Sequence, residues 1–188
     1  MELAHGRVRL KPLASLGRDD WRRVHDHFRD PEIAHLNGTP PNRLPLWLLR
    51  RMLQADARRR DRSTYGVYDE LDAFIGTAEL YDVTTFDATL GIIIGERSHW
   101  NRGYGPEAIQ ALLRHGFETL GLELVRLHTY ADNPRAQRAF RKVGFREVRR
   151  VTERDGRTDV QMSVVRAVWL ARSASRGPDD RAPLAAGR

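Results

Sequence analysis

Cysteine is absent from the 188 residues, which excludes disulfides, thiolate metal sites and a covalent thiol nucleophile. Long apolar runs are missing too, and none approaches the roughly 20 residues that a transmembrane helix needs. The first residues, MELAHGRVRLKP, lack the charged leader and apolar stretch of a secretory signal. We therefore expect a soluble, cytoplasmic protein with no membrane partner and no cysteine-based catalysis.

Lysine is almost absent, with only Lys11 and Lys142 among 32 basic residues. Against 25 acidic residues this composition gives a net charge of +7, which favours an anionic ligand. We interpret the arginines as spread along the chain without a Lys/Arg block. We therefore do not expect nucleic acid to be that ligand.

Length and composition favour one domain with a sizeable core, because 188 residues is an ordinary size for a single unit. The one compositional break comes near Ser173, where SASRGPDDRAPLAAGR combines Gly, Pro, Ser and charge without periodicity. We expect a domain over residues 1–170 and a disordered tail over residues 171–188.

Hydrophobic periodicity predicts an α+β chain in the order βααβββαβαββ, with antiparallel strands first and one βαβ crossover in the middle. Strands are expected over 7–12, 64–68, 73–82, 90–94, 124–131, 145–154 and 158–166. Helices are expected from the Asp19-Asp20 cap, over 44–58, from Pro106 to Gly121, and over 133–143.

The strand over 90–94 is continuously apolar, so we expect both of its faces to be buried. It follows 73–82 closely enough to form an antiparallel hairpin. If the turn spans 83–88, Asp82 faces Thr89 and Glu79 lies opposite Ile92. The alternation places Phe74, Ala78 and Leu80 on one face and Glu79 on the other, more polar face.

A phosphate-binding loop is predicted at 96–105, where ERSHWNRGYG joins the buried strand to a helix. Gly103 and Gly105 let backbone N–H groups turn toward a ligand, and a helix N-terminus attracts anions. Arg97 and Arg102 add full positive charges, so a pyrophosphate would fit. Two other interpretations of this segment are open. In the first, the glycines only relieve steric crowding in an ordinary strand-to-helix loop; in the second, they belong to a dinucleotide-binding fingerprint that Ala108 and Asp132 complete.

The dinucleotide reading fails on its context. Eight residues, 95–102, separate the strand from Gly103, whereas the fingerprint turn follows its strand tightly. Only one further helix follows before the Asp155-Gly156 hairpin, so the repeated βαβ units of a doubly wound sheet are missing.

Four segments together resemble the GNAT superfamily of N-acetyltransferases, over about residues 7–165. They are GRVRLKP, the hairpin FIGTAEL into LGIIIG, then WNRGYGPEA, and finally DNPRAQRAFRKVGF. The sequence looks most similar to the branch that holds ribosomal-protein N-terminal acetyltransferases and small-amine acetyltransferases. The resemblance implies a GNAT fold, with a central mixed, mostly antiparallel sheet, a splayed parallel strand pair (91–95 and 124–131) and helices on both faces.

The resemblance also implies acetyl-CoA as co-substrate, with its pyrophosphate on the 100–105 loop and its pantetheine arm between the splayed strands. Arg141 and Lys142 could approach the phosphates too. In an alternative interpretation, Ile92, Ile93 and Ile94 are only core residues and Asn133 is only a helix cap. Trp100 departs from the Gln or Arg of the family's loop. The cofactor residues carried over are Ile92, Ile93, Ile94, Trp100, Asn101, Arg102, Gly103, Tyr104, Gly105, Asn133, Arg138 and Phe140.

Acetyl transfer to an amine by direct attack needs a base, an aligned thioester, oxyanion stabilisation and a proton for the thiolate. Glu79 is the predicted base or substrate anchor, and a solvated polar strand face is the other reading. The resemblance leads one to expect an acidic Tyr or Ser at positions that are Phe140 and Ala136 here. The candidates for a replacement acid are Tyr130 first, then His128, Tyr81 and His99.

The resemblance predicts an N-acetyltransferase that acts in a ternary complex on a primary amine, either a protein N-terminus or a small amine. The acceptor pocket is expected around His25, His35, Asn37 and Trp47. The missing acid leaves a second function open, that of a non-catalytic acyl-CoA-binding protein. We expect no metal, because no His-Glu helical pair is present, and consider a homodimer as a further partner.

Overall fold

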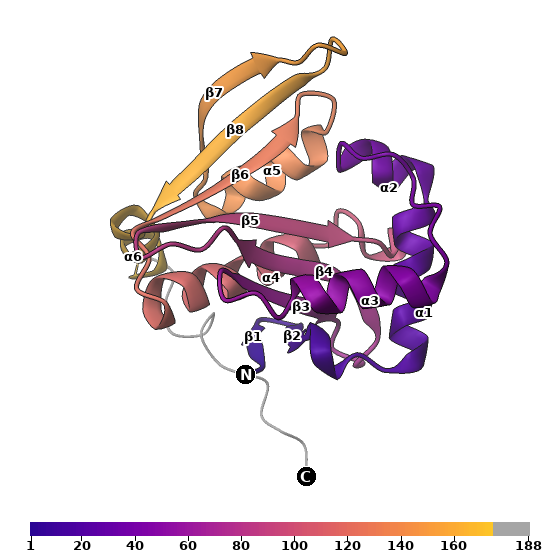
Figure 1. Cartoon of the computed structure of the whole chain (residues 1–188). Coiled ribbons are helices and arrows are strands. Elements are labelled where there is room, and N and C mark those ends of the chain that lie inside the picture. The colour runs from indigo at the N-terminus through magenta and orange to yellow at the C-terminus, as the bar shows by residue number, and fades with distance from the viewer. Residues whose placement is uncertain (175–188) are drawn as a thin grey trace.

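The computed structural model of the chain describes residues 1–174 and contains an eight-stranded sheet with helices on both faces (Figure 1). The strand order is β1-β2-β3-β4-β5-β6-β8-β7, and every neighbouring pair is antiparallel except β5 and β6. The strands are β1 (Leu3–His5), β2 (Val8–Pro12), β3 (Arg62–Tyr68), β4 (Phe74–Tyr81), β5 (Asp87–Ile94), β6 (Leu124–Tyr130), β7 (Arg146–Thr152) and β8 (Thr158–Val165).

The α-helices of the described residues are α1 (Arg18–Arg29), α2 (Pro31–Leu36), α3 (Leu46–Asp56), α4 (Tyr104–Arg114), α5 (Pro134–Val143) and α6 (Arg166–Ala174). Short helical turns are η1 (Leu13–Ser15), η2 (Arg97–His99) and the π-helical η3 (His115–Thr119), which continues α4. None of the helices over residues 1–174 is long and apolar enough to span a membrane.

The predicted α+β class and the order of the predicted elements are confirmed, and besides the short turns η1 and η2 one strand and two α-helices were missed. These are β1, α2 and α6, each only three to nine residues long. The first helix begins at Arg18 after Gly17, and Asp20 accepts a hydrogen bond from the Gly17 N–H at 2.9 Å. Asp19-Asp20 is therefore the first turn of that helix and not its cap.

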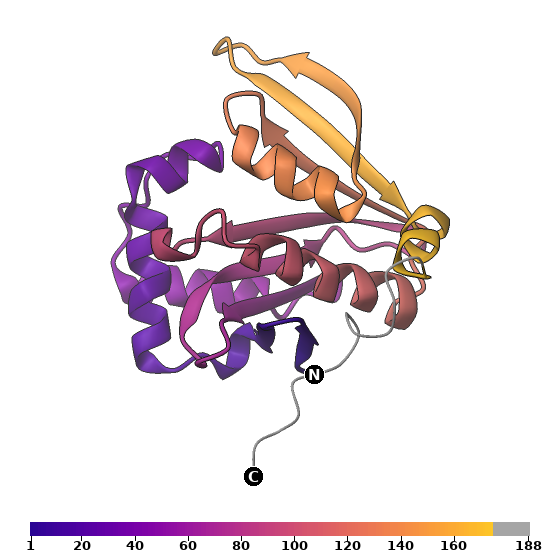
Figure 2. The same cartoon turned by 180° about the vertical axis from the view of Figure 1, so that it is seen from behind.

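Two hydrophobic cores lie on opposite faces of the sheet, with α4 behind it and α3 in front of it in Figure 1 and the reverse in Figure 2. The larger core joins Ala78 and Leu80 to α4. The smaller core contains Trp21, Val24 and Phe74. Phe74 was expected on the face of Ala78, but the register of β3 and β4 shifts beside it and turns its side chain to the other face.

The register of the β4–β5 hairpin differs by one residue from the prediction. Tyr81 pairs with Thr89, so Glu79 lies opposite Gly91 and Ala78 lies opposite Ile92. Asp82 leaves the strand because its φ is +51°, a left-handed conformation that ends β4 one residue early. Because Gly91 has no side chain, the space over it is left to Glu79, whose Cγ would lie 3.3 Å from a Cβ there.

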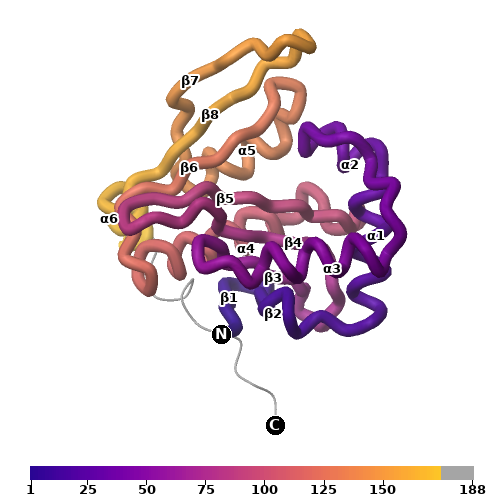
Figure 3. The backbone as a smooth tube through the Cα atoms, viewed as in Figure 1, coloured from indigo at the N-terminus to yellow at the C-terminus, as the bar shows by residue number. Residues whose placement is uncertain are grey.

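The parallel pair β5–β6 is splayed, as predicted. Its pairing runs only from Asp87–Leu124 to Thr89–Arg126, after which β6 diverges from β5 and stays paired with β8 (Figure 3). The prediction that both faces of this strand are buried is wrong for its last three residues, Ile92 to Ile94. These residues have lost one neighbouring strand and are half-buried. The splay therefore opens the sheet beside these isoleucines.

The C-terminal boundary of the predicted domain falls inside α6, which runs to Ala174. Trp169 fixes this helix to the larger core, because it is buried and its indole N–H donates to Gln110 Oε1 at 2.8 Å. The rest of the predicted tail, residues 175–188, lies outside the described residues.

Candidate functional site

Three cavities meet where β5 and β6 separate. The α5 cavity, of about 450 Å³, lies between β5, the start of α4 and α5. The α2 cavity, of about 580 Å³, lies beside α1, α2 and the loop after α2. The Glu79 cavity, of about 160 Å³, lies over β4 and β5. Asn37 and Ile93 line all three, so the opening in the sheet joins two sides of the molecule.

The α5 cavity is bordered by the predicted phosphate loop. Gly103 is the N-cap of α4 with φ +96°, and Asn101 has φ +60°, so the backbone turns sharply just before the helix. The helix N-terminus has unpaired N–H donors and a partial positive charge, and Gly103 and Gly105 line the cavity. This end of the cavity can bind an anionic group.

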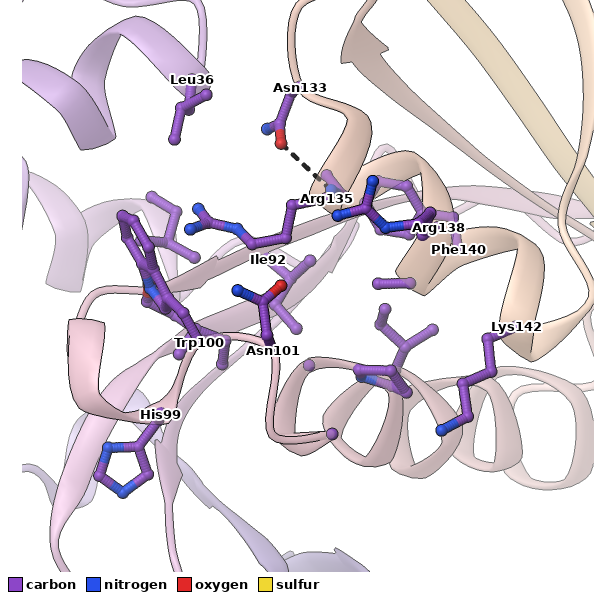
Figure 4. A pocket seen from close by; sticks show the side chains of 18 of the residues that line it. Leu36, Ile92, His99, Trp100, Asn101, Asn133, Arg135, Arg138, Phe140 and Lys142 are labelled. Atoms are coloured by element: carbon purple, nitrogen blue, oxygen red, sulfur yellow. Dashed lines mark hydrogen bonds between the residues drawn. The ribbon is translucent and has the colours of Figure 1, made fainter.

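Trp100 and Arg135 connect the two walls of the α5 cavity (Figure 4). The indole N–H of Trp100 donates to the Ile94 carbonyl oxygen at 2.6 Å, which fixes the ring against the end of β5. The guanidinium of Arg135, on α5, lies 3.3 Å from the centre of that ring. Burial lowers the pKa of Arg135, and no carboxylate in residues 1–174 forms an ion pair with it. Arg135 is a functional candidate that the sequence reasoning missed.

The charged residues of the loop are not equally available to a ligand. Arg97 forms ion pairs with Asp30 at 2.7 Å and Glu32 at 2.8 Å, and this contact holds the pKa of Asp30 below its usual range. The charge of Arg97 is already paired with carboxylates at the start of α2, and its contribution to an anion site stays a prediction. Arg138 lines the cavity.

Asn133 and Phe140 both line the α5 cavity and both have structural roles. Asn133 is the N-cap of α5, because its Oδ1 accepts from the Ala136 N–H at 3.1 Å (Figure 4). Phe140 is buried and packs at 6.0 Å from Phe145. Asn133 is thus a helix cap. It also lies on the cavity wall, where it can contact a ligand.

Tyr104 and Arg102 point away from this cavity. The Tyr104 hydroxyl donates to Glu70, and its ring packs under Arg7 at 4.3 Å. The Arg102 side chain donates to the Ser98 carbonyl. Neither residue lines the α5 cavity, so only their backbone groups remain candidates for a cofactor contact.

Glu79 lines its own cavity together with Gly91, Ile92 and Ile93. Its Oε2 accepts from Arg62 at 3.0 Å and from Thr64 at 3.3 Å. Burial raises the pKa of the Glu79 carboxyl, although the Arg62 charge acts in the opposite direction. A half-buried carboxylate with a raised pKa beside the opening of the sheet has the properties of a general base.

The four proposed acids do not converge on this site. The Tyr130 hydroxyl donates to Glu153 at 3.3 Å, and its ring packs against Arg157 and Gly38. His128 bonds Asp159, and His99 bonds Asp69 through one nitrogen and Ser98 through the other. Among the four, only His99 lines one of the three cavities. The Tyr130 hydroxyl is bonded at the β7–β8 turn, and its assignment as the acid stays a prediction.

Of the four residues expected around the acceptor pocket, only Asn37 lines any of the three cavities. Asn37 lines every cavity, but Trp47 is 66% exposed on the outer face of α3. His25 contacts the Leu44 carbonyl and His35 contacts Asp132. The histidine that does line the α2 cavity is His27, which stacks on Phe74 and covers Gly95. The sequence signal that could have identified His27 is its position three residues after Val24, which is about one helical turn.

No group of three or more His, Cys, Asp or Glu side chains in residues 1–174 is arranged to hold a metal ion. The chemistry available at the three cavities is therefore that of one anion-binding helix start, several guanidinium groups, two half-buried carboxylates and apolar walls.

Residues 7–146 match the family model described as "Acetyltransferase (GNAT) domain". A curated relative, the human alpha/beta-tubulin-N-acetyltransferase 9, is 28% identical over 141 residues, which cover 67% of this chain and 67% of that protein.

Solved structures with the same fold include spermidine N-acetyltransferase from Vibrio cholerae in complex with CoA and spermine. It has a TM-score of 0.78 and 22% identity, and the match covers 87% of this chain and 98% of that one. A dodecameric structure of spermidine N-acetyltransferase from the same organism has a TM-score of 0.70 and 21% identity, with 89% and 98% covered.

Proposed function

Because the chain belongs to the GNAT acetyltransferase family and is therefore an N-acetyltransferase, we propose that it moves the acetyl group of acetyl-CoA to a primary amine by direct attack in a ternary complex. One observation carries this proposal. Cavities on two sides of the sheet share Ile93 at the splay, so two substrates can meet there without an enzyme nucleophile.

Acetyl-CoA fits the α5 cavity by its chemistry. Its pyrophosphate needs N–H donors and cations, which the start of α4, Arg135 and Arg138 offer. Its pantetheine arm needs a narrow, mostly apolar channel, which Ile92, Ile94 and Phe140 border. In the proposed complex the thioester lies beside Ile93, at the opening toward Glu79.

Arg135→Ala should weaken acetyl-CoA binding about tenfold, because the stacked guanidinium takes the place of the charged side chain that Trp100 lacks. Isothermal titration with acetyl-CoA measures this loss. S-acetyl-pantetheine, which has no pyrophosphate, should react equally well with both proteins.

The matched control for this prediction is Arg141→Ala. Arg141 is on the same helix, but it bonds Gln137 and Glu147 and does not line the cavity. Equal affinity for acetyl-CoA in the Arg135→Ala variant and the wild type would exclude Arg135 from the phosphate site.

The proposed acceptor side is the α2 and Glu79 cavities. Glu79 takes a proton from the acceptor's ammonium group, directly or through water, so that the neutral amine can attack, or it anchors that group. The residues that line the α5 cavity include no Tyr, Ser, Thr, Asp or Glu, and both ring nitrogens of His99, which does line it, are bonded to Asp69 and Ser98. A thiol with a pKa of roughly 8.5 is a tolerable leaving group near neutral pH, so water can supply this proton.

The test is acetyl-CoA turnover across a panel of amines that includes peptide N-termini, small amines and polyamines. The proposal expects slow but real transfer to at least one of them, with a protein N-terminus as the leading acceptor, as in the ribosomal-protein acetyltransferase branch. Saturating acetyl-CoA binding with no turnover on any amine would favour the non-catalytic acyl-CoA-binding alternative. Self-association stays a prediction, supported by the dodecameric relative.

A further inference from the structure

The positive charge of the protein is concentrated on one segment around α3. Residues 43–62 contain seven arginines and two aspartates, which is a surplus of five out of the chain's net charge of +7. The expectation of an even spread along the chain is therefore corrected. This segment begins at the α2 cavity, which Arg43 lines, and ends at the Glu79 cavity, which Asp56 and Arg62 line.

Six of these arginines are exposed, and five of the six, all except Arg59, form no ion pair within residues 1–174. The segment also exposes an aromatic side chain, Trp47, which follows Arg43 and stands one helical turn from Arg50 and Arg51. We call this set the α3 arginine surface. Its members are Arg43, Trp47, Arg50, Arg51, Arg58 and Arg60.

The acceptor cavities themselves contain no carboxylate that lacks a cationic partner. Asp56 Oδ2 and Glu79 Oε2 share one guanidinium, that of Arg62, at 3.1 and 3.0 Å. The α2 cavity has Arg43 as its charged residue, and burial lowers the pKa of its histidine, His27. A polyamine would bring two or more positive charges to a site whose negative charges are already compensated and whose rim is positive.

We infer that the acceptor is a polypeptide that receives the acetyl group on its N-terminal amine. Acidic residues follow this amine in the polypeptide and bind the α3 arginine surface. This inference rests on the proposed function and names its substrate class. Opposite charge at the rim raises the rate of encounter and selects the partner, while Trp47 offers an apolar contact for the chain. Nucleic acid fits the charge but not the reaction, because base amines are conjugated to their rings and are weak nucleophiles.

The experiment compares two ten-residue peptides with the same N-terminal dipeptide and either four Glu or four Gln residues after it. Spermidine is the third acceptor. At about 0.1 M salt the Glu peptide should have a kcat/KM at least tenfold above that of the Gln peptide and of spermidine. Because the screening length falls from about 10 Å at 0.1 M salt to about 3 Å at 1 M, the preference should shrink as salt is raised.

A triple variant, Arg50→Gln with Arg51→Gln and Arg58→Gln, should lower the kcat/KM of the Glu peptide to that of the Gln peptide. The control removes three exposed arginines from β7 and its turn, by Arg146→Gln, Arg149→Gln and Arg154→Gln. The control should keep the full preference, although its net charge falls by the same amount.

Equal kcat/KM for the two peptides, or spermidine as the best acceptor, would overturn the inference and leave the proposed function intact. Loss of the preference in both triple variants would also overturn it, because net charge and not this surface would then be responsible. Acetyl-CoA binding without turnover on any acceptor would remove the proposed function, and the inference with it.

Discussion

Replacing Glu79 with Gln should lower the turnover number by about 10² to 10⁴ while acetyl-CoA affinity stays unchanged. The amide keeps the shape of the side chain but cannot accept the ammonium proton. Glu79 faces the Glu79 cavity and not the α5 cavity, so cofactor binding should be unaffected. Steady-state kinetics on one accepted amine, with an acetyl-CoA titration beside it, measures both quantities.

The pH dependence gives this prediction a second readout. Burial raises the pKa of Glu79, and a base must be ionised to act, so the wild-type rate should fall as pH drops through that raised pKa. A carboxyl whose pKa is raised on folding contributes stability that is fully present below its unfolded pKa and is lost as pH rises through the raised, folded pKa. At neutral pH the Glu79→Gln variant should therefore be at least as stable as the wild type in thermal unfolding.

The control for Glu79 is Glu123→Gln, because Glu123 is an exposed carboxylate paired with Arg166 and lines none of the three cavities. It should keep the wild-type rate. Wild-type turnover in Glu79→Gln would mean that this carboxylate is only part of a polar strand face.

A single methyl group at Gly76 should damage both the fold and the cofactor site. A Cβ there would overlap the carbonyl oxygen of Ile93, because Gly76 pairs with Ile94 across the β4–β5 ladder. Backbone cannot move aside as a flexible side chain can, so Gly76→Ala should lower the free energy of unfolding by about 1 to 3 kcal/mol. It should also raise the KM for acetyl-CoA, since Ile93 borders the α5 cavity.

Urea unfolding and acetyl-CoA kinetics test this prediction together. Gly17→Ala is the control, because Gly17 has an ordinary φ of −74° and the nearest atom to its Cβ would be Asp20 Oδ2 at 3.5 Å. A Gly76→Ala protein with wild-type stability and wild-type KM would show that β5 can yield at this point.

Local sequence signals were sufficient for most of the elements and for the loop. Periodicity over 106–121 predicted a helix that the structure divides into α4 and a π-helical turn, with Gly121 at φ +72° where the chain leaves it. Gly103 and Asn133 were identified from their places at helix starts, and both are N-caps. These features depend on neighbours in the chain, which a sequence displays.

Features that depend on distant contacts could not be predicted in this way. The register of the β4–β5 hairpin depends on the left-handed conformation of Asp82, which Asp adopts more often than most residues but which its presence in a sequence does not predict. The stacking of Arg135 on Trp100 joins residues 35 positions apart. The contacts of Tyr130 with Glu153 and Arg157 join β6 to the β7–β8 turn, more than 20 positions along the chain.

The placement of acetyl-CoA in the α5 cavity is the central claim, and a crystal structure of the protein grown with CoA tests it most directly. The account predicts pyrophosphate oxygens within hydrogen-bond distance of backbone N–H groups in residues 101–105. It also predicts Arg135 on the phosphates and the thiol beside Ile93, facing the Glu79 cavity. CoA bound outside the α5 cavity, or a pyrophosphate that makes no contact with the start of α4, would contradict it.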